Sequence, residues 1–288
     1  MLRRYLQLDV FAERAGMGNP LGVVLDGDGL DTPRMQALAA WLDLSETVFF
    51  VPTTHPHADY AVRIFTPVTE LPFAGHPSVG AAWAAVESGL VAPDAVALQQ
   101  QCAAGLLPAR LHEDARGRRA AIRAPRAMQC TGDAAFAPLL DAALAGMPRG
   151  ALAARWNNGP TWWCVELADA AAVRDAAPDL AAIAALTRAS GAVGLAVFAP
   201  AQAGDHALVV RAFCPADGID EDPVTGSANA CIAAQLADAA RLPAARFVSS
   251  QGRELGRDGR VEIEVDDECE VWIGGAVQAV VRGTLEWD

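Results

Sequence analysis

A repeated segment constrains the fold of this chain more than any other feature of its sequence. Residues 62–67 read V-R-I-F-T-P and residues 210–215 read V-R-A-F-C-P. Each segment is typical of a strand, and each is followed by a polar loop and then by small residues that favour a helix starting beside a proline. Chance similarity between two stretches rich in alanine and glycine is the alternative explanation. The shared lead-in favours an internal duplication, so we expect two related halves.

Apolar periodicity predicts strands and helices in both halves. In the first half the expected strands are residues 5–11, 22–25, 47–51 and 61–65, and the expected helices are residues 33–41 and 78–86. In the second half we expect strands at residues 119–124, 162–167, 195–198 and 208–213, and helices at residues 135–145 and 180–188. The last part of the chain is typical of antiparallel strands, at residues 261–265, 270–273 and 276–285.

The acidic composition restricts the partners of this protein. The formal net charge is −13 at pH 7 and the sequence pI is about 4.8. Nucleic acid and anionic membranes would both repel such a surface, so we expect neither as a partner. A small anionic substrate remains compatible, because a few local donors outweigh distant charges. The first residues lack the apolar core of a signal peptide and the apolar runs are too short to cross a bilayer, so we expect a cytoplasmic protein.

The motifs predict neither a metal nor a nucleotide cofactor. The six cysteines are scattered singly without a C-x-x-C pair, and the histidines lack the H-x-x-x-H spacing of a zinc site. The chain also lacks a phosphate-binding loop and a G-x-G-x-x-G motif after a strand. Reduced cysteines in a cofactor-free protein are the simplest interpretation.

The two expected helix starts are candidate anion-binding sites. Unpaired backbone N–H groups and the partial positive charge of a helix N-terminus attract anions. If a pseudo-twofold axis relates the halves, the two starts face each other across a cleft. The alternative for each start is a capped helix that binds no ligand. Small residues at both starts would let a ligand approach the backbone: Gly75, Ser78 and Gly80 in the first half, and Thr225, Gly226, Ser227 and Ala228 in the second.

Titratable and hydroxyl side chains accompany both helix starts. His76 lies at the first start, and Asp222 and Ser227 lie at the second. Glu46 precedes the apolar run of residues 47–51, where burial would raise the pKa of its carboxyl towards neutrality. A general acid/base that works near pH 7 requires such a pKa. A solvated glutamate at the edge of a strand is the commoner alternative.

At these residues the sequence resembles the phenazine-biosynthesis (PhzF-like) isomerase family, whose fold is similar to that of diaminopimelate epimerase. The matching motifs are D-V-F at residues 9–11, G-N-P at 18–20, L-S-E-T at 44–47, F-A-G-H-P at 73–77, E-D-P-V-T-G-S-A at 221–228, Q-G at 251–252 and G-R at 256–257. They occur in this order across essentially the whole chain. The ordered set is therefore far more specific than any single motif.

The resemblance implies an α+β fold of two pseudo-symmetric domains, each a barrel-like, mostly antiparallel sheet around a central helix. The expected N-terminal half is residues 1–115 with a returning strand at 277–288, and the C-terminal half is residues 116–276. The resemblance also implies that Glu46 is the acid/base, with assistance from other side chains and with backbone amides holding the carboxylate of the substrate. The residues that it assigns are the catalytic Glu46, His76, Asp222 and Ser227, and the substrate-binding Gly75, Pro77, Ser78, Thr225, Gly226 and Asn19.

One departure from the epimerase relatives bears on the reaction. Those enzymes use a cysteine at each helix start as paired acid and base, whereas Ala74 and Thr225 occupy these positions here. Neither side chain can take a proton from carbon, so we prefer a cofactor-independent isomerase in which one carboxylate moves a proton within a small carboxylate substrate. An amino-acid epimerase or racemase that uses other groups, and a non-catalytic carboxylate-binding protein, are the alternatives. The resemblance is also compatible with a homodimer.

Overall fold

The computed structural model describes residues 1–115, 117–202 and 204–288, which form two compact units. Unit 1 consists of Met1–Arg123 and Ile273–Asp288, and unit 2 consists of Ala124–Trp272. The sequence analysis placed the boundaries at residues 115 and 277. The first boundary differs because residues 117–123 pair as a hairpin with residues 105–114 and so stay with unit 1.

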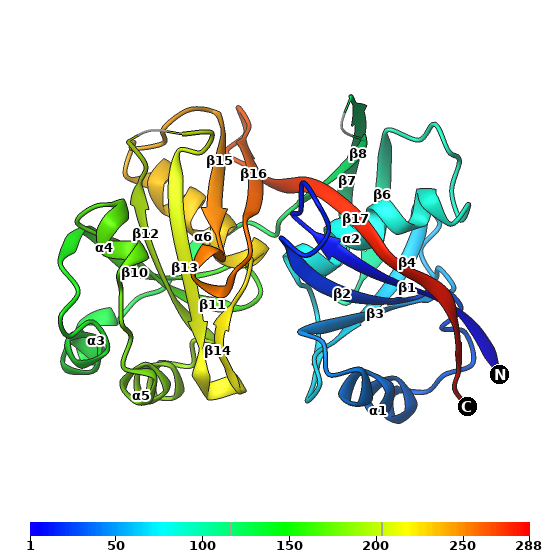
Figure 1. Ribbon diagram of the computed structural model, residues 1–288, viewed down its shortest axis with the longest axis horizontal. Coiled ribbons are helices and arrows are strands. Elements are labelled where there is room, and N and C mark those ends of the chain that lie inside the picture. The colour runs from blue at the N-terminus through cyan, green and yellow to red at the C-terminus, as the bar shows by residue number, and fades with distance from the viewer. Residues whose placement is uncertain (116, 203) are drawn as a thin grey trace. The chain divides into compact units, whose positions relative to one another are not determined.

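Unit 1 is a closed barrel of strands. Its strands are β1 (Leu2–Val10), β2 (Asn19–Val24), β3 (Glu46–Val51), β4 (Tyr60–Phe65), β5 (Glu70–Leu71), β6 (Ala97–Cys102), β7 (Gly105–Asp114), β8 (Gly117–Arg123) and β17 (Val271–Glu286). The order around the barrel is β1-β2-β3-β4-β6-β7-β8-β17, and β17 closes it by pairing antiparallel with β1. Figure 1 shows the end of the chain in red beside the blue first strand, with both termini close together. The expected return of the last strand to the first half is confirmed.

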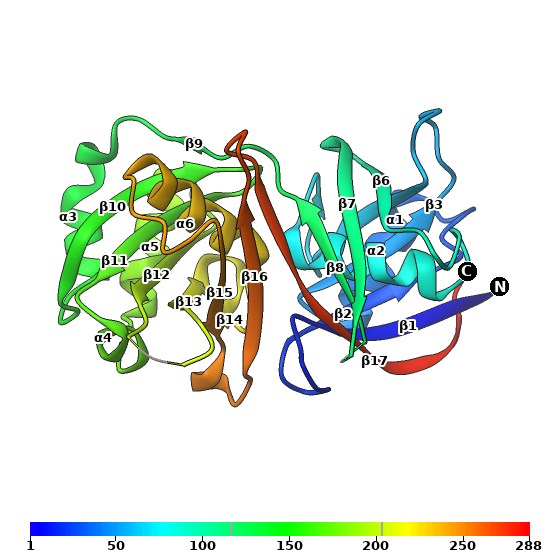
Figure 2. The same cartoon turned by 90° about the horizontal axis from the view of Figure 1, so that it is seen from above.

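Helix α2 (Gly75–Glu87) lies inside this barrel. Strands of unit 1 surround it in Figure 2, and its residues from Gly75 to Val86 are buried. Small side chains such as Ala81 and Ala85 let this helix fit inside the barrel, where larger side chains would not fit. Gly80 shows how close the packing is, because a Cβ at this position would lie 2.4 Å from Leu21. The second helix, α1 (Thr32–Leu42), contacts β3 and β4.

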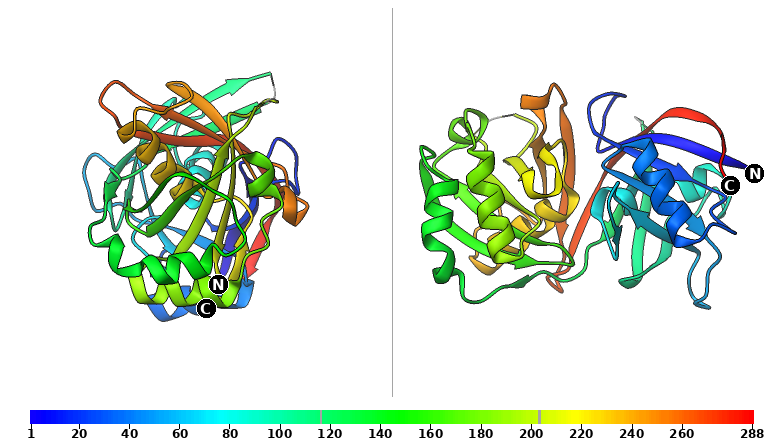
Figure 3. Two further views of the ribbon diagram at one scale, coloured as in Figure 1. Left: turned by 90° about the vertical axis from the view of Figure 1, so that its left-hand side faces the viewer. Right: turned by 90° about the horizontal axis from the view of Figure 1, so that it is seen from below.

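Unit 2 also wraps a sheet around one helix. Its strands are β9 (Met128–Gln129), β10 (Arg149–Asn157), β11 (Thr161–Leu167), β12 (Gly194–Pro200), β13 (Leu208–Cys214), β14 (Ile219–Asp222), β15 (Arg246–Gln251) and β16 (Gly259–Val265). Helix α6 (Gly226–Asp238) is almost fully buried and packs on β10, β11 and β16. The other helices, α3 (Ala137–Ala143), α4 (Ala170–Arg174) and α5 (Leu180–Ser190), pack through an apolar cluster that includes Trp163 and Phe213 (Figure 3).

The strands of the two units pair in the same scheme. In unit 1, β1 pairs antiparallel with β2, β2 parallel with β3, β3 antiparallel with β4, and β4 parallel with β6. In unit 2 the same directions recur for β10 with β11, β11 with β12, β12 with β13, and β13 with β15. Each unit also has a short strand in the equivalent place: β5 pairs antiparallel with β4 in unit 1, and β14 pairs antiparallel with β13 in unit 2. The two copies of the repeated segment therefore occupy equivalent places, as a duplication predicts.

An ion pair explains the arginine of the repeated segment. Arg63 Nε and Nη2 donate to the carboxylate of Glu70 at 2.7 and 2.6 Å, which ties β4 to β5. Arg211 Nε and Nη2 donate to Glu221 at 2.9 and 2.8 Å, which ties β13 to β14. Such two-point contacts fix geometry as well as charge. Each pair lies just before the helix inside its own unit, so the duplicated residues set where that helix begins.

The α+β fold with two barrel-like halves is confirmed, and two local expectations differ. Residues 271–286 form one strand rather than two, because Gly274 is an extended residue pressed against β8, where a Cβ would lie 2.6 Å from Ala121. Helix α2 begins at Gly75 rather than at residue 78, since the first turn of a helix tolerates proline. In the part of the chain that the structure describes, no helix is long and apolar enough to cross a membrane.

Candidate active site

The start of α2 forms the first part of the candidate site. The N-cap residue is Ala74, and within the described residues no side chain caps the helix. Gly75, His76 and Pro77 fill the first turn and are buried. Ser78 is fully buried, and its Oγ accepts a hydrogen bond from Gln100 Nε2 at 2.9 Å. Backbone N–H groups that no side chain caps are what an anion-binding helix start requires.

Glu46 and His76 meet at this helix start. Glu46 is the first residue of β3 and His76 is the second residue of α2. Their closest atoms, Glu46 Oε2 and His76 Nε2, are 3.4 Å apart, and the side chains are 17% and 4% exposed. The structure thus brings together two of the predicted catalytic residues. Glu46 is largely buried, so the alternative of a fully solvated edge glutamate does not hold.

The His76 ring is neutral, and its tautomer is defined. Burial lowers the pKa of His76 from 6.5 to about 3, although a hydrogen bond to the backbone of Pro20 opposes the shift. Proline has no N–H, so the ring donates to the Pro20 carbonyl. Because Nε2 is the nitrogen beside Glu46, Nδ1 is the donor. A neutral imidazole with its proton on Nδ1 presents only a lone pair at Nε2.

This tautomer bears on the proton of Glu46. A protonated carboxyl can donate its O–H to the Nε2 lone pair, whereas a carboxylate oxygen would face that lone pair with its own. The contact therefore offers an acceptor to a protonated Glu46 carboxyl, which suits a group that holds a proton between taking it from one carbon and returning it to another.

A loop between β1 and β2 supports these residues from behind. The carboxylate of Asp9 accepts hydrogen bonds from the backbone N–H groups of Gly16 at 2.6 Å and Gly18 at 3.1 Å. The loop leads to Asn19 and Pro20. Asn19 is fully buried, and its Oδ1 accepts from Ser45 Oγ at 3.0 Å, one residue before Glu46. Asn19 thus holds Ser45, the residue before Glu46, in place. A contact between Asn19 and the substrate stays a prediction.

The start of α6 forms the second part of the candidate site, in unit 2. Thr225 is the N-cap residue, and its Oγ1 donates to Asp222 Oδ2 at 2.5 Å. Gln251, fully buried at the end of β15, joins both residues. Its Nε2 donates to the Asp222 carbonyl at 3.0 Å and to Thr225 Oγ1 at 2.9 Å. Its Oε1 accepts from Thr225 N at 3.1 Å and from Asn229 Nδ2 at 3.0 Å.

Ser227 is held by the β10–β11 hairpin. It is the second residue of α6, directly after Gly226, and is 8% exposed. Its Oγ accepts a hydrogen bond from Trp162 Nε1 at 3.1 Å. Its carbonyl accepts one from Asn158 Nδ2 at 3.0 Å.

The structure therefore groups the predicted residues by unit. Glu46, Gly75, His76, Pro77 and Ser78 lie together at the start of α2, and Asp222, Thr225, Gly226 and Ser227 lie together at the start of α6. The site residues predicted from the sequence do not include Gln251, Asn158 or Trp162, and the tryptophans around residues 157–160 were expected either to cover an apolar pocket or to pack in the core. The Q-G motif and the tryptophans around residues 157–160 were the signals available for them.

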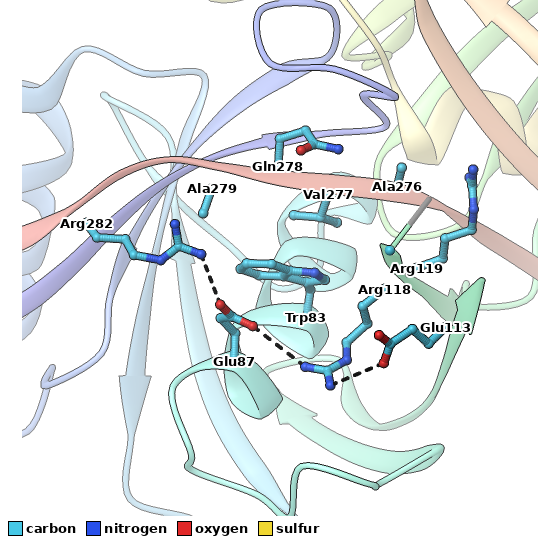
Figure 4. A pocket seen from close by; sticks show the side chains of 11 residues that line it. Trp83, Glu87, Glu113, Arg118, Arg119, Ala276, Val277, Gln278, Ala279 and Arg282 are labelled. Atoms are coloured by element: carbon cyan, nitrogen blue, oxygen red, sulfur yellow. Dashed lines mark hydrogen bonds and ion pairs between the residues drawn. The ribbon is translucent and has the colours of Figure 1, made fainter. Parts of the chain in front are cut away.

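A cavity in unit 1 lies elsewhere on α2. It has a volume of about 380 Å³ and is lined by residues of the second half of the helix, the β7–β8 hairpin and β17 (Figure 4). Glu87 contacts Arg282 at 2.9 Å and Arg118 at 3.8 Å, and Arg118 also lies 3.8 Å from Glu113, so these charges compensate one another. Trp83 lies two turns beyond His76, so the cavity is separate from the candidate site. Among the described residues no cluster of histidine, cysteine, aspartate or glutamate could hold a metal ion.

Comparison with known proteins agrees with this fold. Two barrel-like halves, each around a helix whose start has no side-chain cap among the described residues, define a class of two-domain α+β folds that solved structures of phenazine biosynthesis proteins share. Within that class the chain belongs to the phenazine biosynthesis-like (PhzC-PhzF) family, whose profile matches residues 8–283. The protein is an isomerase of this family.

Three relatives illustrate the similarity. The chain is 34% identical over 263 residues to the trans-2,3-dihydro-3-hydroxyanthranilate isomerase of Pseudomonas aeruginosa, covering 90% of this chain and 89% of the relative. It is 35% identical over 275 residues to an uncharacterized isomerase of Deinococcus radiodurans, covering 92% and 87%. A solved structure described as a predicted epimerase from Pseudomonas aeruginosa superposes with a TM-score of 0.79 at 32% identity, covering 98% and 99%.

Proposed function

We propose that this isomerase moves a proton within a small carboxylate substrate, with the Glu46 carboxyl as its acid/base and without a cofactor. The observation that carries the proposal is the 3.4 Å approach of Glu46 to the neutral His76 at the start of α2. A buried carboxyl beside a lone pair, next to uncapped backbone N–H groups, combines a proton carrier with an anion site.

Each group has a definite part in this reaction. Glu46 takes a proton from a carbon that a neighbouring alkene or carbonyl activates, and the protonated carboxyl returns it to another carbon of the same molecule. His76 accepts the O–H of the protonated carboxyl and so holds it in place between the two steps. Atoms and charges balance, because the proton that leaves one carbon returns to the substrate. A positioned acid/base contributes about 10² to 10⁴-fold, and orientation and exclusion of water must supply the rest.

The residues of unit 2 would hold the substrate. The N–H groups at the start of α6 suit a carboxylate, and Ser227 offers a hydroxyl beside them. Asp222 accepts the Thr225 hydroxyl, which orients its carboxylate. No nucleic acid or membrane takes part, and assembly into homodimers stays a prediction.

The test is turnover in D₂O with a panel of carboxylates. The panel begins with trans-2,3-dihydro-3-hydroxyanthranilate, on which the relative from Pseudomonas aeruginosa acts, and adds cyclic amino acids such as 4-hydroxyproline. NMR distinguishes migration of a double bond from inversion of a stereocentre, which is the outcome of the epimerase alternative. We expect Glu46→Gln to lower the rate at least about 10²-fold, because an amide cannot shuttle protons. Glu113→Gln, at an exposed glutamate of the same unit, is the control. Full turnover by Glu46→Gln would refute the assignment, and binding of a panel member without exchange at carbon would favour a non-catalytic role.

A further inference from the structure

The duplication identifies the residue of unit 2 that stands in the place of Glu46. In unit 1 the parallel ladder pairs Leu21 of β2 with Glu46, and the next residue, Thr47, pairs with Phe65. In unit 2 the parallel ladder pairs Trp162 of β11 with Gly194, and the next residue, Leu195, pairs with Phe213. Phe65 and Phe213 are the same position of the repeated segment. Gly194 is therefore the counterpart of Glu46, and Trp162 is the counterpart of Leu21.

Trp162 fills the space that a side chain at Gly194 would need. A Cβ at Gly194 would lie 2.4 Å from Trp162 Cζ3 and 2.7 Å from the Phe213 carbonyl oxygen, both closer than atoms can approach. Unit 2 thus carries an indole where unit 1 carries a carboxyl. His76 and Ser227 are the second residues of α2 and α6 and so correspond to each other. His76 faces Glu46 in unit 1, and Ser227 faces Trp162 in unit 2.

The indole determines what the Ser227 hydroxyl can do. A hydroxyl has one proton to donate and two lone pairs. Indole N–H groups only donate, so Trp162 occupies a lone pair of Ser227 Oγ at 3.1 Å and leaves its proton for another partner. Within the residues that the structure describes, this hydroxyl donates to no protein acceptor. Asn158 fixes the Ser227 carbonyl at 3.0 Å, so the rest of the residue is held as well.

We propose that Trp162 is a positioning residue that turns Ser227 into a hydrogen-bond donor for an acceptor oxygen of the substrate. The substrate class follows, because the group that receives the Ser227 proton must be an acceptor such as a carboxylate or carbonyl oxygen. The inference rests on the proposed function only in placing the substrate at the start of α6. It concerns binding rather than proton transfer.

Binding of carboxylates tests the proposal. The probes are benzoate, anthranilate and L-proline, each compared by calorimetry with its amide, in which an uncharged group replaces the carboxylate. Trp162→Phe keeps a six-membered aromatic ring and removes the pyrrole ring with its N–H donor. We expect it to weaken carboxylate binding about tenfold, the usual worth of one hydrogen bond to a charged group. Ser227→Ala should weaken binding similarly. The double variant should bind no more weakly than Ser227→Ala alone, because Trp162 acts through Ser227.

Trp156, the partner of Trp162 on the neighbouring strand β10, provides a matched control. Trp156 is 6% exposed, but its buried Nε1 has no hydrogen-bond partner among the described residues. Trp156→Phe removes the same atoms from the same layer, so a structural effect alone would weaken binding in both variants equally. We expect carboxylate binding to be unchanged in Trp156→Phe.

Three results would overturn the inference: additive effects in the double variant, equal losses in the two tryptophan variants, and a wild-type protein that binds none of the carboxylate probes. Glu46→Gln separates this inference from the proposed function. That variant should lose exchange at carbon and still bind carboxylates. If it kept its turnover while the Trp162 and Ser227 effects remained coupled, only the role of Glu46 would be refuted.

Discussion

The neutral His76 ring makes the stability of this protein sensitive to acid in a defined pH range. The ring takes up a proton near pH 6.5 in the unfolded chain and only near pH 3 in the folded protein, because burial opposes its charge. Above pH 6.5 the ring is neutral in both states and adds no pH dependence. Below pH 6.5 only the unfolded chain binds the proton, so the free energy of unfolding decreases as the pH falls towards 3.

The size of this effect follows from the pKa difference. Each pH unit inside the window is worth about 1.4 kcal/mol, so at pH 4.5 the histidine lowers the free energy of unfolding by about 3 kcal/mol relative to pH 7. His76→Asn removes the titrating group and keeps a side-chain N–H that can donate to the Pro20 carbonyl. The variant should therefore lose less stability than the wild type between pH 7 and pH 4.5, by about 3 kcal/mol.

Urea denaturation at several pH values between 7 and 4.5 measures this difference, and the same series in the Glu46→Gln background removes the titration of the neighbouring carboxyl from the comparison. His112→Asn, at an exposed histidine on β7 of the same unit, should retain the wild-type pH dependence. NMR of the ring nitrogens gives an independent reading, with Nδ1 protonated and Nε2 unprotonated at pH 5. A His76 ring that titrates near pH 6.5, or parallel curves for the wild type and His76→Asn, would contradict the assignment of a neutral ring.

Two substitutions test the frame of unit 2. Gln251→Leu deprives Thr225 N–H and the Asp222 carbonyl of buried partners and should lower the free energy of unfolding by about 3–5 kcal/mol in denaturation experiments. Gln100→Leu, at an equally buried glutamine whose side chain pairs with the Tyr60 and Ser78 hydroxyls, should cost less, and the opposite ranking would count against the network. Gly194→Ala should cost about 2–3 kcal/mol because its methyl group would collide with Trp162, whereas Gly283→Ala has open space and should change the melting temperature little.

Local signals in the sequence predicted the strands and helices, and the resemblance to a known family supplied the barrel architecture. The two copies of V-R-x-F with a following run of small residues predicted both strand–loop–helix units, and each arginine pairs with a glutamate a few residues further on, as Arg63 does with Glu70. The predicted start of α2 is three residues late because Pro77 was assigned to the preceding loop, although it is the third residue of the helix. The division of residues 270–285 into two strands failed because Gly274 serves close packing against Ala121 rather than a turn.

The candidate site was predictable only as far as its residues lie in short motifs. Glu46 and His76 were both identified as site residues, yet the sequence does not show that the barrel buries the His76 ring and keeps it neutral, or that the Pro20 carbonyl of a separate loop accepts its proton. Gln251 and Trp162 act on residues that are 26 and 65 positions away in the chain. Contacts at such separations depend on strand order and register, which neither periodicity nor composition determines.

The two units share the same strand pairing but differ at the positions of the candidate catalytic residues. Both units retain the arginine–glutamate pair and the uncapped helix start, but Glu46 is matched by Gly194 and His76 by Ser227. Inversion at a stereocentre is served by a donor and an acceptor on opposite faces of a carbon. Gly194, which matches Glu46 in unit 2, carries neither, and the nearby carboxylate of Asp222 accepts the Thr225 hydroxyl instead. A single carboxyl returns its proton to the face from which it came. This asymmetry leads us to expect migration of a double bond in the product rather than inversion.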